Sequence, residues 1–152
     1  MKFIANHMLG RLARWLRVLG YDVVYLKKPV KGELWIKAKA EDRMVLTRNT
    51  HYQKKQGFKV FLIKENKVID QLAEVIKGLN LHINTEKLFT RCIDCNVSLS
   101  PIPKAEVKGK VPIYIYNTQK HFSYCPDCKR IYWWGTHGER FYKFLSEKGV
   151  LP

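Results

Sequence analysis

Short apolar runs alternate with amphipathic segments over about the first 80 residues of the chain. Four runs have the length and residue types of buried strands: Lys2–Ala5, Asp22–Leu26, Met44–Thr47 and Lys59–Ile63. Four segments have helical patterns: Leu9–Leu19, Glu33–Ala40, a short basic one from Thr50 to Gly57, and Ile69–Leu79. Such alternation is typical of a parallel sheet with helices on both faces, in which ligands bind beyond the carboxyl ends of the strands. We therefore expect Asn6, residues 26–28 and residues 48–49 to lie together at one sheet edge.

The pattern changes after residue 80. Residues 81–89 are predicted to form a linker, and from residue 90 prolines, aromatic residues and paired cysteines replace the alternation. A strand-like run, Val111–Tyr116, lies inside this part, and His137–Lys148 has a helical pattern. The predicted organisation is an α/β domain at 1–80, a linker at 81–89, a small β module at 90–135 and a C-terminal helix at 136–152.

The four cysteines form two CxxC pairs, Cys92–Cys95 and Cys125–Cys128. Each such turn presents two thiolates to one side of an ion, and two turns on opposing hairpins complete the tetrahedron of a zinc ribbon. With four cysteine ligands no position is open for a catalytic water, so we expect one structural zinc ion. Two disulfides, a redox pair and a rubredoxin-type iron centre are the alternatives.

Charge narrows the choice of partner. Lysine and arginine number 28 against 13 aspartates and glutamates, which gives a net charge of +15. A field of this sign attracts polyanions, and nucleic acid is the partner that we expect, ahead of an anionic membrane surface. The alternative without a partner is that the charge serves solubility alone. No apolar stretch is long enough to span a bilayer, and the N-terminal residues do not resemble a signal peptide, so we expect a cytoplasmic protein without a membrane partner.

Several cations are candidate contacts to RNA. Arg11, Arg14 and Arg17 recur three residues apart on one predicted helix and could contact phosphates as a stripe, or could form internal ion pairs. Further candidates follow the third strand and flank the cysteine pairs: Arg48, Lys54, Lys55, Arg91, Lys129 and Arg130. Those near the cysteines are interleaved with aromatic residues, which either stack on bases or build the core of the ribbon: Tyr114, Tyr116, Phe122, Tyr124, Tyr132, Trp133 and Trp134.

Six motifs in a fixed order carry a family resemblance. They are Phe3-Ile4-Ala5-Asn6, the run from Met8 to Arg17, Gly20-Tyr21-Asp22, the run from Arg43 to Arg48, the run from Arg91 to Asn96, and the run from Tyr132 to His137. Together they resemble the Mut-seven C-terminal ribonuclease-domain family over nearly the whole chain. The resemblance implies a PIN-like three-layer α/β/α domain with a parallel sheet, followed by a small β zinc ribbon and a C-terminal helix.

The resemblance also implies a nuclease centre, in which carboxylates at the strand ends hold Mg²⁺ or Mn²⁺ for phosphodiester hydrolysis. Two positions where the family pattern has an acid carry Asn6 and Asn49 here, and Glu33 is the residual acidic candidate near the second helix. Neutral amide oxygens attract a hard dication less than carboxylates do. The pattern therefore indicates an eroded metal centre.

Three hypotheses follow. The first is a protein that binds structured RNA, with ribosomal RNA or a ribosomal particle as a candidate, on a ribonuclease scaffold. The second is a metal-dependent endoribonuclease that retains activity through Glu33 or another acid, with Mg²⁺ or Mn²⁺ as its cofactor. The third is a zinc-ribbon module that binds a protein or DNA, although DNA is the less expected nucleic acid.

Overall fold

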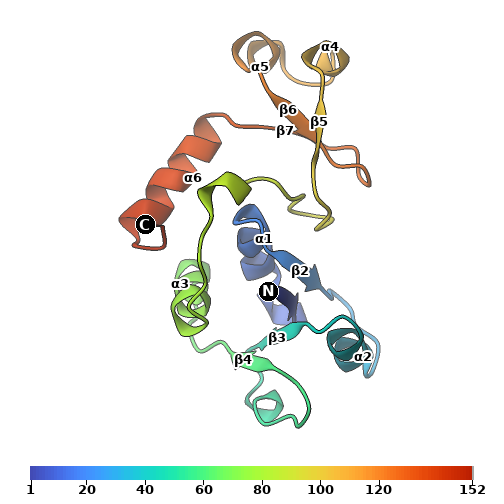
Figure 1. Ribbon diagram of the computed structural model, residues 1–152, viewed down its shortest axis with the longest axis vertical. Helices are drawn as coiled ribbons and strands as arrows, with labels where there is room; N and C mark the ends of the chain where they lie inside the picture. Colours follow the sequence, from blue (N-terminus) through green and yellow to red (C-terminus); the bar gives the residue numbers. More distant parts are fainter. Residues whose placement is uncertain (152) are drawn as a thin grey trace.

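The computed structural model describes residues 1–151, and a four-stranded parallel sheet forms the centre of its N-terminal part (Figure 1). Its strands are β1 (Lys2–Ala5), β2 (Asp22–Tyr25), β3 (Met44–Thr47) and β4 (Val60–Leu62). They lie in the order β2-β1-β3-β4. The chain thus adds β2 on one side of β1 and then β3 and β4 on the other side, and the strand order reverses between β1 and β3. The predicted parallel α/β fold is confirmed.

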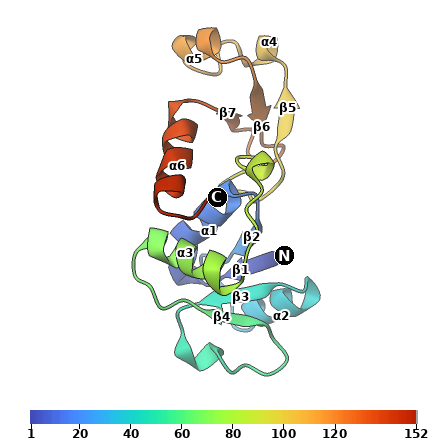
Figure 2. The same ribbon diagram turned by 60° about the vertical axis from the view of Figure 1, so that its left-hand side comes forward.

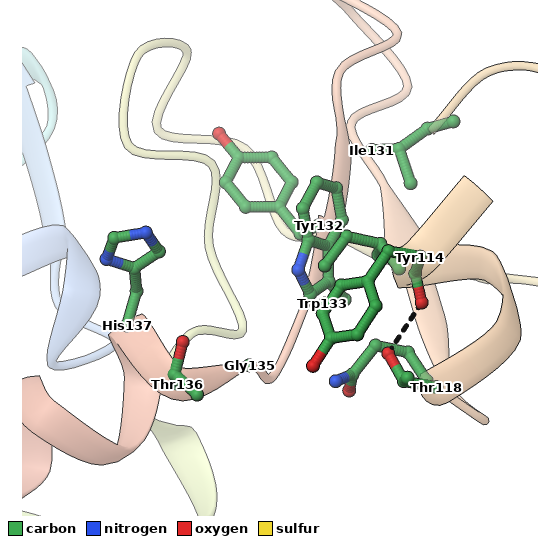
Figure 3. Close-up of a pocket in the computed structure, with 10 residues that line it drawn as sticks. Tyr114, Thr118, Ile131, Tyr132, Trp133, Gly135, Thr136 and His137 are labelled. Carbon is green, nitrogen blue, oxygen red and sulfur yellow. Dashed lines mark hydrogen bonds between the residues drawn. The ribbon is translucent and has the colours of Figure 1, made fainter. Parts of the chain in front are cut away.

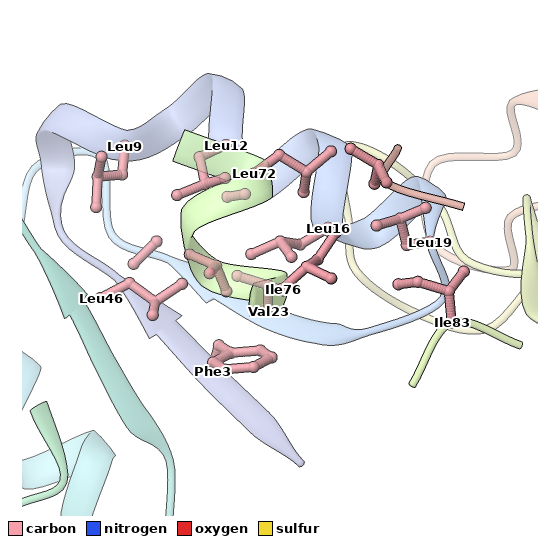
Figure 4. Close-up of a cluster of buried hydrophobic side chains, with 14 of the residues drawn as sticks. Phe3, Leu9, Leu12, Leu16, Leu19, Val23, Leu46, Leu72, Ile76 and Ile83 are labelled. Carbon is pink, nitrogen blue, oxygen red and sulfur yellow. The ribbon is translucent and has the colours of Figure 1, made fainter. Parts of the chain in front are cut away.

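The larger core lies between one face of this sheet and two helices, α1 (Gly10–Val18) and α3 (Val68–Gly78). A short 3-10 helix, η1 (His7–Leu9), joins β1 to α1. Leu12 and Leu16 of α1 are fully buried against β1 and α3, and Figure 4 shows them beside Leu72 of α3. Removing such side chains from water is the main stabilising contribution to this part of the fold.

Helix α2 (Glu33–Ala40) covers the opposite face of the sheet, where Leu34 and Ala38 pack on Ile4 and Val45. Trp35 extends this cluster by edge-on contacts with Tyr52 and Phe58. Helices therefore lie on both faces, which makes three layers. The basic helix expected from Thr50 to Gly57 is shorter than predicted, since only one 3-10 turn, η2 (Thr50–Tyr52), forms there.

Residues 81–89 pack along the α/β body. Ile83 and Leu88 are buried in the same core as α1, on either side of a 3-10 turn, η3 (Thr85–Lys87). Gly20 allows this close approach because it adopts a φ of +90° and a Cβ there would lie 2.6 Å from the Lys87 carbonyl oxygen. The Phe89 amide then donates to the Val18 carbonyl at 2.8 Å, which fixes the chain as it leaves the body.

The second sheet is small and antiparallel, with β5 (Ser100–Ile102), β6 (Phe122–Tyr124) and β7 (Ile131–Trp133) in that order. Two short helices, α4 (Lys104–Val107) and α5 (Ile113–Thr118), connect β5 to β6. The strand predicted at Val111–Tyr116 is therefore wrong. Pro112 precedes the first turn of α5 and has no amide to donate to a sheet, and the side chains of Ile113 and Tyr114 stay exposed instead of packing on a sheet face.

Helix α6 (Thr136–Glu147) returns from the small sheet to the α/β body (Figures 1 and 2). Trp15 of α1 lies edge-on to Phe141 and Phe144, with ring centroids 5.0 Å and 5.9 Å apart. Leu145 and the two residues at the end of the described chain, Val150 and Leu151, are buried in the α1 core. In residues 1–151 no helix has the length and hydropathy to cross a bilayer.

Candidate metal centre and nucleic-acid interface

The two CxxC turns have the same local geometry. In each, the amide of the second cysteine donates to the sulfur of the first at 3.4 Å, from Cys95 to Cys92 and from Cys128 to Cys125. The residue after the second cysteine adopts a left-handed conformation, with φ of 68° at Asn96 and 65° at Lys129. Its amide donates to the carbonyl of the first cysteine at 2.9 Å in both turns. In each of the two turns, the backbone thus closes around its own pair of sulfurs.

The four sulfur atoms converge on one point. They all lie within 4.8 Å of one another, and the Sγ atoms of Cys92 and Cys128 are 3.8 Å apart. Cys92 and Cys125 are buried, Cys95 is half-buried and Cys128 is exposed. Four thiolates in this arrangement can hold one metal ion.

Without a cation, the four thiols differ in how readily they ionise. Burial of Cys92 opposes its ionisation, but hydrogen bonds from the Tyr132 hydroxyl and from two backbone amides outweigh it and lower the pKa to about 7. Burial and the neighbouring sulfurs raise the pKa of Cys95 to about 12, and burial also raises the pKa of Cys125. Four sulfurs this close can all be thiolates at neutral pH only if a cation offsets their repulsion.

Side chains of the first CxxC turn bind directly to the edge strand β2. The Asn96 side-chain amide donates to Asp22 Oδ1 at 2.7 Å, and the Asn96 side-chain oxygen accepts the Val23 backbone amide at 2.9 Å. Strand β2 is an edge strand, paired with β1. The cysteine cluster is therefore fixed to the α/β body by polar contacts as well as by the chain.

Arg17 is part of the same junction, and its predicted role as an RNA contact is wrong. Its side chain is 6% exposed and donates to the Val23 carbonyl at 2.9 Å and 2.8 Å and to the Ile93 carbonyl at 2.8 Å. Desolvation by burial lowers the pKa of Arg17, although the nearby Cys92 and Asp94 act in the opposite direction. A guanidinium with these bonds is not available to phosphate.

The predicted arginine stripe is consequently not one row of free cations. Arg14 donates to Asp94 Oδ1 at 2.7 Å, and Arg130 pairs with Asp94 Oδ2. The carboxylate of Asp94, in the first CxxC turn, therefore joins α1 to the residues that follow the second CxxC turn. Both arginines remain about half exposed, at 52% and 51% of their side-chain surface. Of the stripe, Arg11 alone is exposed without an ion pair among residues 1–151.

The other candidate cations are distributed over two regions. Lys54 and Lys55 are exposed after η2, and the Lys55 ammonium lies 5.3 Å from the Trp35 ring centroid. Arg48, just after β3, donates to Asn66 at 2.6 Å. Beside the CxxC turns, Arg91 donates to the Asn96 backbone carbonyl, and Lys129 is exposed with its ammonium 6.0 Å from the Tyr124 ring centroid.

Most of the positive charge is not neutralised inside the molecule. Within the described chain, six of the 28 lysines and arginines form ion pairs with acids: Arg14, Lys37, Arg43, Lys59, Arg130 and Lys143. Apart from the buried Arg17, the remaining cations have no acidic partner in the described chain, and their charge attracts a polyanion.

The carboxyl ends of β1 and β3 meet where the sheet order reverses, the position at which α/β sheets bind ligands. The Asn6 side-chain amide donates to the Thr47 hydroxyl at 3.2 Å, and the Asn49 backbone amide donates to the same hydroxyl at 3.0 Å. The side-chain oxygens of Asn6 and Asn49 accept the amides of His7 and His51 and so cap the two 3-10 turns. The predicted gathering of Asn6 and Asn49 at this edge is present as a neutral network.

The acids of the α/β body have other partners. Asp22 and Glu41 pair with Arg43 at the amino end of the sheet, the edge opposite to Asn6. Glu33 accepts the Val30 amide at 3.0 Å where α2 begins. In the portion of the chain that the structure describes, the four cysteines are the one group of three or more histidine, cysteine or acidic side chains that could share an ion.

Sequence reasoning missed the junction side chains Asn96 and Tyr132. The Tyr132 hydroxyl lies 3.1 Å from Cys92 Sγ and accepts the Ile93 amide at 3.3 Å. The signal for Asn96 was present, because asparagine is enriched at left-handed positions such as the one that follows a CxxC turn. Nothing in the sequence separates Tyr132 from the other aromatic residues of the small sheet.

Comparison with known families gives one match. The family model described as the Mut7-C RNAse domain matches residues 1–145, which includes both sheets and most of α6. A search of curated proteins found no match to the chain.

Proposed function

Because the chain belongs to the Mut7-C RNAse domain family, we propose that it binds structured RNA in the cytoplasm on a nuclease scaffold whose metal centre is eroded. Family membership indicates a ribonuclease-like or RNA-related function, and the proposal narrows it to binding without metal-dependent cleavage. Ribosomal RNA or a ribosomal particle is the candidate target. Its dense phosphate backbone suits a protein with a net charge of +15.

One observation carries the proposal. At the switch point between β1 and β3, Asn6 and Asn49 present amide groups that are already hydrogen-bonded to Thr47 and to the backbone. A Mg²⁺ or Mn²⁺ centre for phosphodiester hydrolysis depends on several carboxylates to hold the ion and on that ion to activate water. With neutral side chains in these two positions, the switch point lacks the charge to hold a hard dication.

The cysteine cluster supports a zinc ion with a structural role. Four sulfurs about 2.3 Å from one zinc ion lie about 3.8 Å apart in a tetrahedron, which equals the Cys92–Cys128 separation of 3.8 Å. Four thiolate ligands fill the coordination sphere, so the ion organises the small sheet and leaves no site for a reacting water. In this proposal the ion holds Arg91, Lys129 and Arg130 in place as RNA contacts.

The experiment compares the wild type with the double variant Asn6→Asp/Asn49→Asp on labelled structured RNA in Mg²⁺ and in Mn²⁺. The proposal expects intact RNA with the wild type and cleavage by the double variant, because the substitutions restore two carboxylates at the switch point. Asn84→Asp is the matched control, since Asn84 also caps a 3-10 turn, by accepting the Glu86 amide at 2.9 Å, but lies on η3.

The family's description favours an active endoribonuclease as the second candidate. In that case the wild type cleaves RNA in the presence of metal, and Glu33→Gln abolishes the cleavage. For the third candidate, a module that binds DNA or protein, tighter binding of duplex DNA than of RNA at the same salt concentration would replace the proposal. Sequencing the RNA that copurifies with the protein from cells identifies the target.

A further inference from the structure

A cavity of about 410 Å³ lies between the small sheet and the start of α6. Figure 3 shows the side chains that line it: Tyr114 and Thr118 come from α5, Tyr132 and Trp133 from β7, and His137 from the first turn of α6. The cavity is thus built by three elements of the part of the chain that follows the first CxxC turn. Its volume falls within the range of about 300–1,000 Å³ that is usual for small-molecule sites.

The lining combines aromatic faces with groups that form hydrogen bonds. The Tyr114 side chain is 71% exposed, although it lies beside a cavity that also contains Trp133. Thr118 is already bonded to the Tyr114 carbonyl at 2.8 Å, whereas Gln119 and His137 bring further donors and acceptors to the cavity. No acidic residue lines it.

We propose that this cavity receives one unstacked base of single-stranded RNA. A base has a flat π-face that stacks on tyrosine and tryptophan, and a polar edge that matches amide and imidazole groups. The inference rests on the proposed RNA binding and deepens it. The proposed surface contacts phosphates, and the cavity adds a subsite that recognises a base.

Charge around the cavity favours this occupant. Lys120 follows the lining residue Gln119, and Arg140 lies one turn beyond His137 on α6. Both are exposed, and neither forms an ion pair within residues 1–151. Phosphates on either side of the bound base would therefore meet cations.

The cavity is also joined to the metal centre through Tyr132. Tyr132 is one of the residues that line the cavity, and its hydroxyl lies 3.1 Å from Cys92 Sγ and accepts the Ile93 amide. The position of this wall is therefore set by the first CxxC turn. A structural ion in the cysteine cluster would thereby keep the base site in shape.

The test uses the full-length protein and an oligouridylate that carries one central 2-aminopurine, whose fluorescence falls when the base stacks on an aromatic ring. Tyr114→Ala removes an exposed ring, so the variant is expected to fold. Ile113→Ala is the matched control, because Ile113 is the 79% exposed neighbour on the same helix and does not line the cavity.

The inference expects quenching with the wild type and with Ile113→Ala, and its loss with Tyr114→Ala, together with a 5- to 150-fold weaker affinity, about what one base stack contributes. Tyr114→Phe keeps the ring and should restore both signals.

If the wild type binds the RNA and Tyr114→Ala binds and quenches equally well, the base site is refuted and the proposed function stands. If the wild type binds no RNA at all, both proposals fail. If an acidic peptide binds in the cavity and the oligonucleotide does not, the site is a protein-binding one and the inference is overturned.

Discussion

Asn6 and Thr47 join the carboxyl ends of β1 and β3 through a buried hydrogen bond of 3.2 Å. Thr47 is fully buried and also accepts the Asn49 amide at 3.0 Å, so one hydroxyl organises both asparagines of the switch point. In the proposed function, this network stands where a metal-dependent nuclease of the family would have carboxylates. The network is satisfied internally, so its contribution is to the stability of the fold at this end of the sheet.

Replacing Thr47 with valine should destabilise the protein by about 1–3 kcal/mol, because the buried Asn6 amide and the Asn49 amide both lose their acceptor while the shape of the side chain is kept. Urea unfolding followed by circular dichroism measures the change. Thr50→Val is the control, since Thr50 is exposed on η2, and it should change the free energy of unfolding by less than about 0.5 kcal/mol. Equal effects of the two substitutions would show that the network contributes nothing.

Arg17→Lys should lower the free energy of unfolding by about 1.5–3 kcal/mol, the usual contribution of a buried hydrogen bond to a charged group. A lysine cannot reproduce the fork that reaches the Val23, Ile93 and Asp94 carbonyls together. Arg11→Lys is the matched control on the exposed side of the same helix and should leave stability unchanged. A stable Arg17→Lys protein would mean that the junction with the CxxC turn does not depend on this guanidinium.

The junction should also give stability a dependence on pH. Burial of Asp22 favours its neutral form, but hydrogen bonds from Arg43 and Asn96 outweigh that effect and lower its pKa below the ordinary value of 3.8. Because the pKa is depressed in the folded state, the stabilisation is fully present above about pH 4 and is lost as the pH falls through the folded-state pKa. Between about pH 2 and pH 5, the free energy of unfolding of Asp22→Asn should therefore depend less on pH than that of the wild type. Parallel curves of unfolding free energy against pH for the two proteins would contradict the assignment.

Removing the metal should unfold the small sheet and spare the α/β body. In small zinc modules about 10–16 kcal/mol of metal-binding free energy is also folding free energy, whereas the body has its own core around α1 and α3. Hydrogen exchange after treatment with a chelator is expected to show lost protection in β5, β6 and β7 and retained protection in β1 and β3. Since the thiols must lose protons to bind the ion, retention of the metal should weaken as the pH falls. Unchanged exchange across the small sheet would show that the four cysteines do not depend on an ion.

The parallel sheet and the cysteine cluster could be predicted because both depend on local patterns. Buried strands such as Met44–Thr47 carry their apolar run within four residues, and each CxxC turn closes on its own backbone. Both signals are independent of what the segments contact later in the fold.

The role of Arg17 could not be read from the same patterns. Successive residues of an α-helix are rotated by about 100°, so two steps of three residues do not stay in line, and Arg17 lies about 120° around the helix from Arg11. That rotation turns Arg17 toward β2 and the CxxC turn, which is a partner distant in sequence. The helix at Ile113–Thr118 was missed for a related reason: its β-branched and aromatic residues favour a strand only where a sheet is there to receive them.

The central claim is that the unpaired cations form a surface that binds RNA through its phosphates. The most direct measurement is the affinity for a structured RNA over a series of salt concentrations. We expect the affinity to fall by about 10³-fold or more between 50 and 200 mM salt, as for about six or more phosphate contacts, and Lys54→Ala to reduce the slope by about one unit. An affinity that is independent of salt, or a slope that Lys54→Ala and Arg11→Ala leave unchanged, would contradict the account.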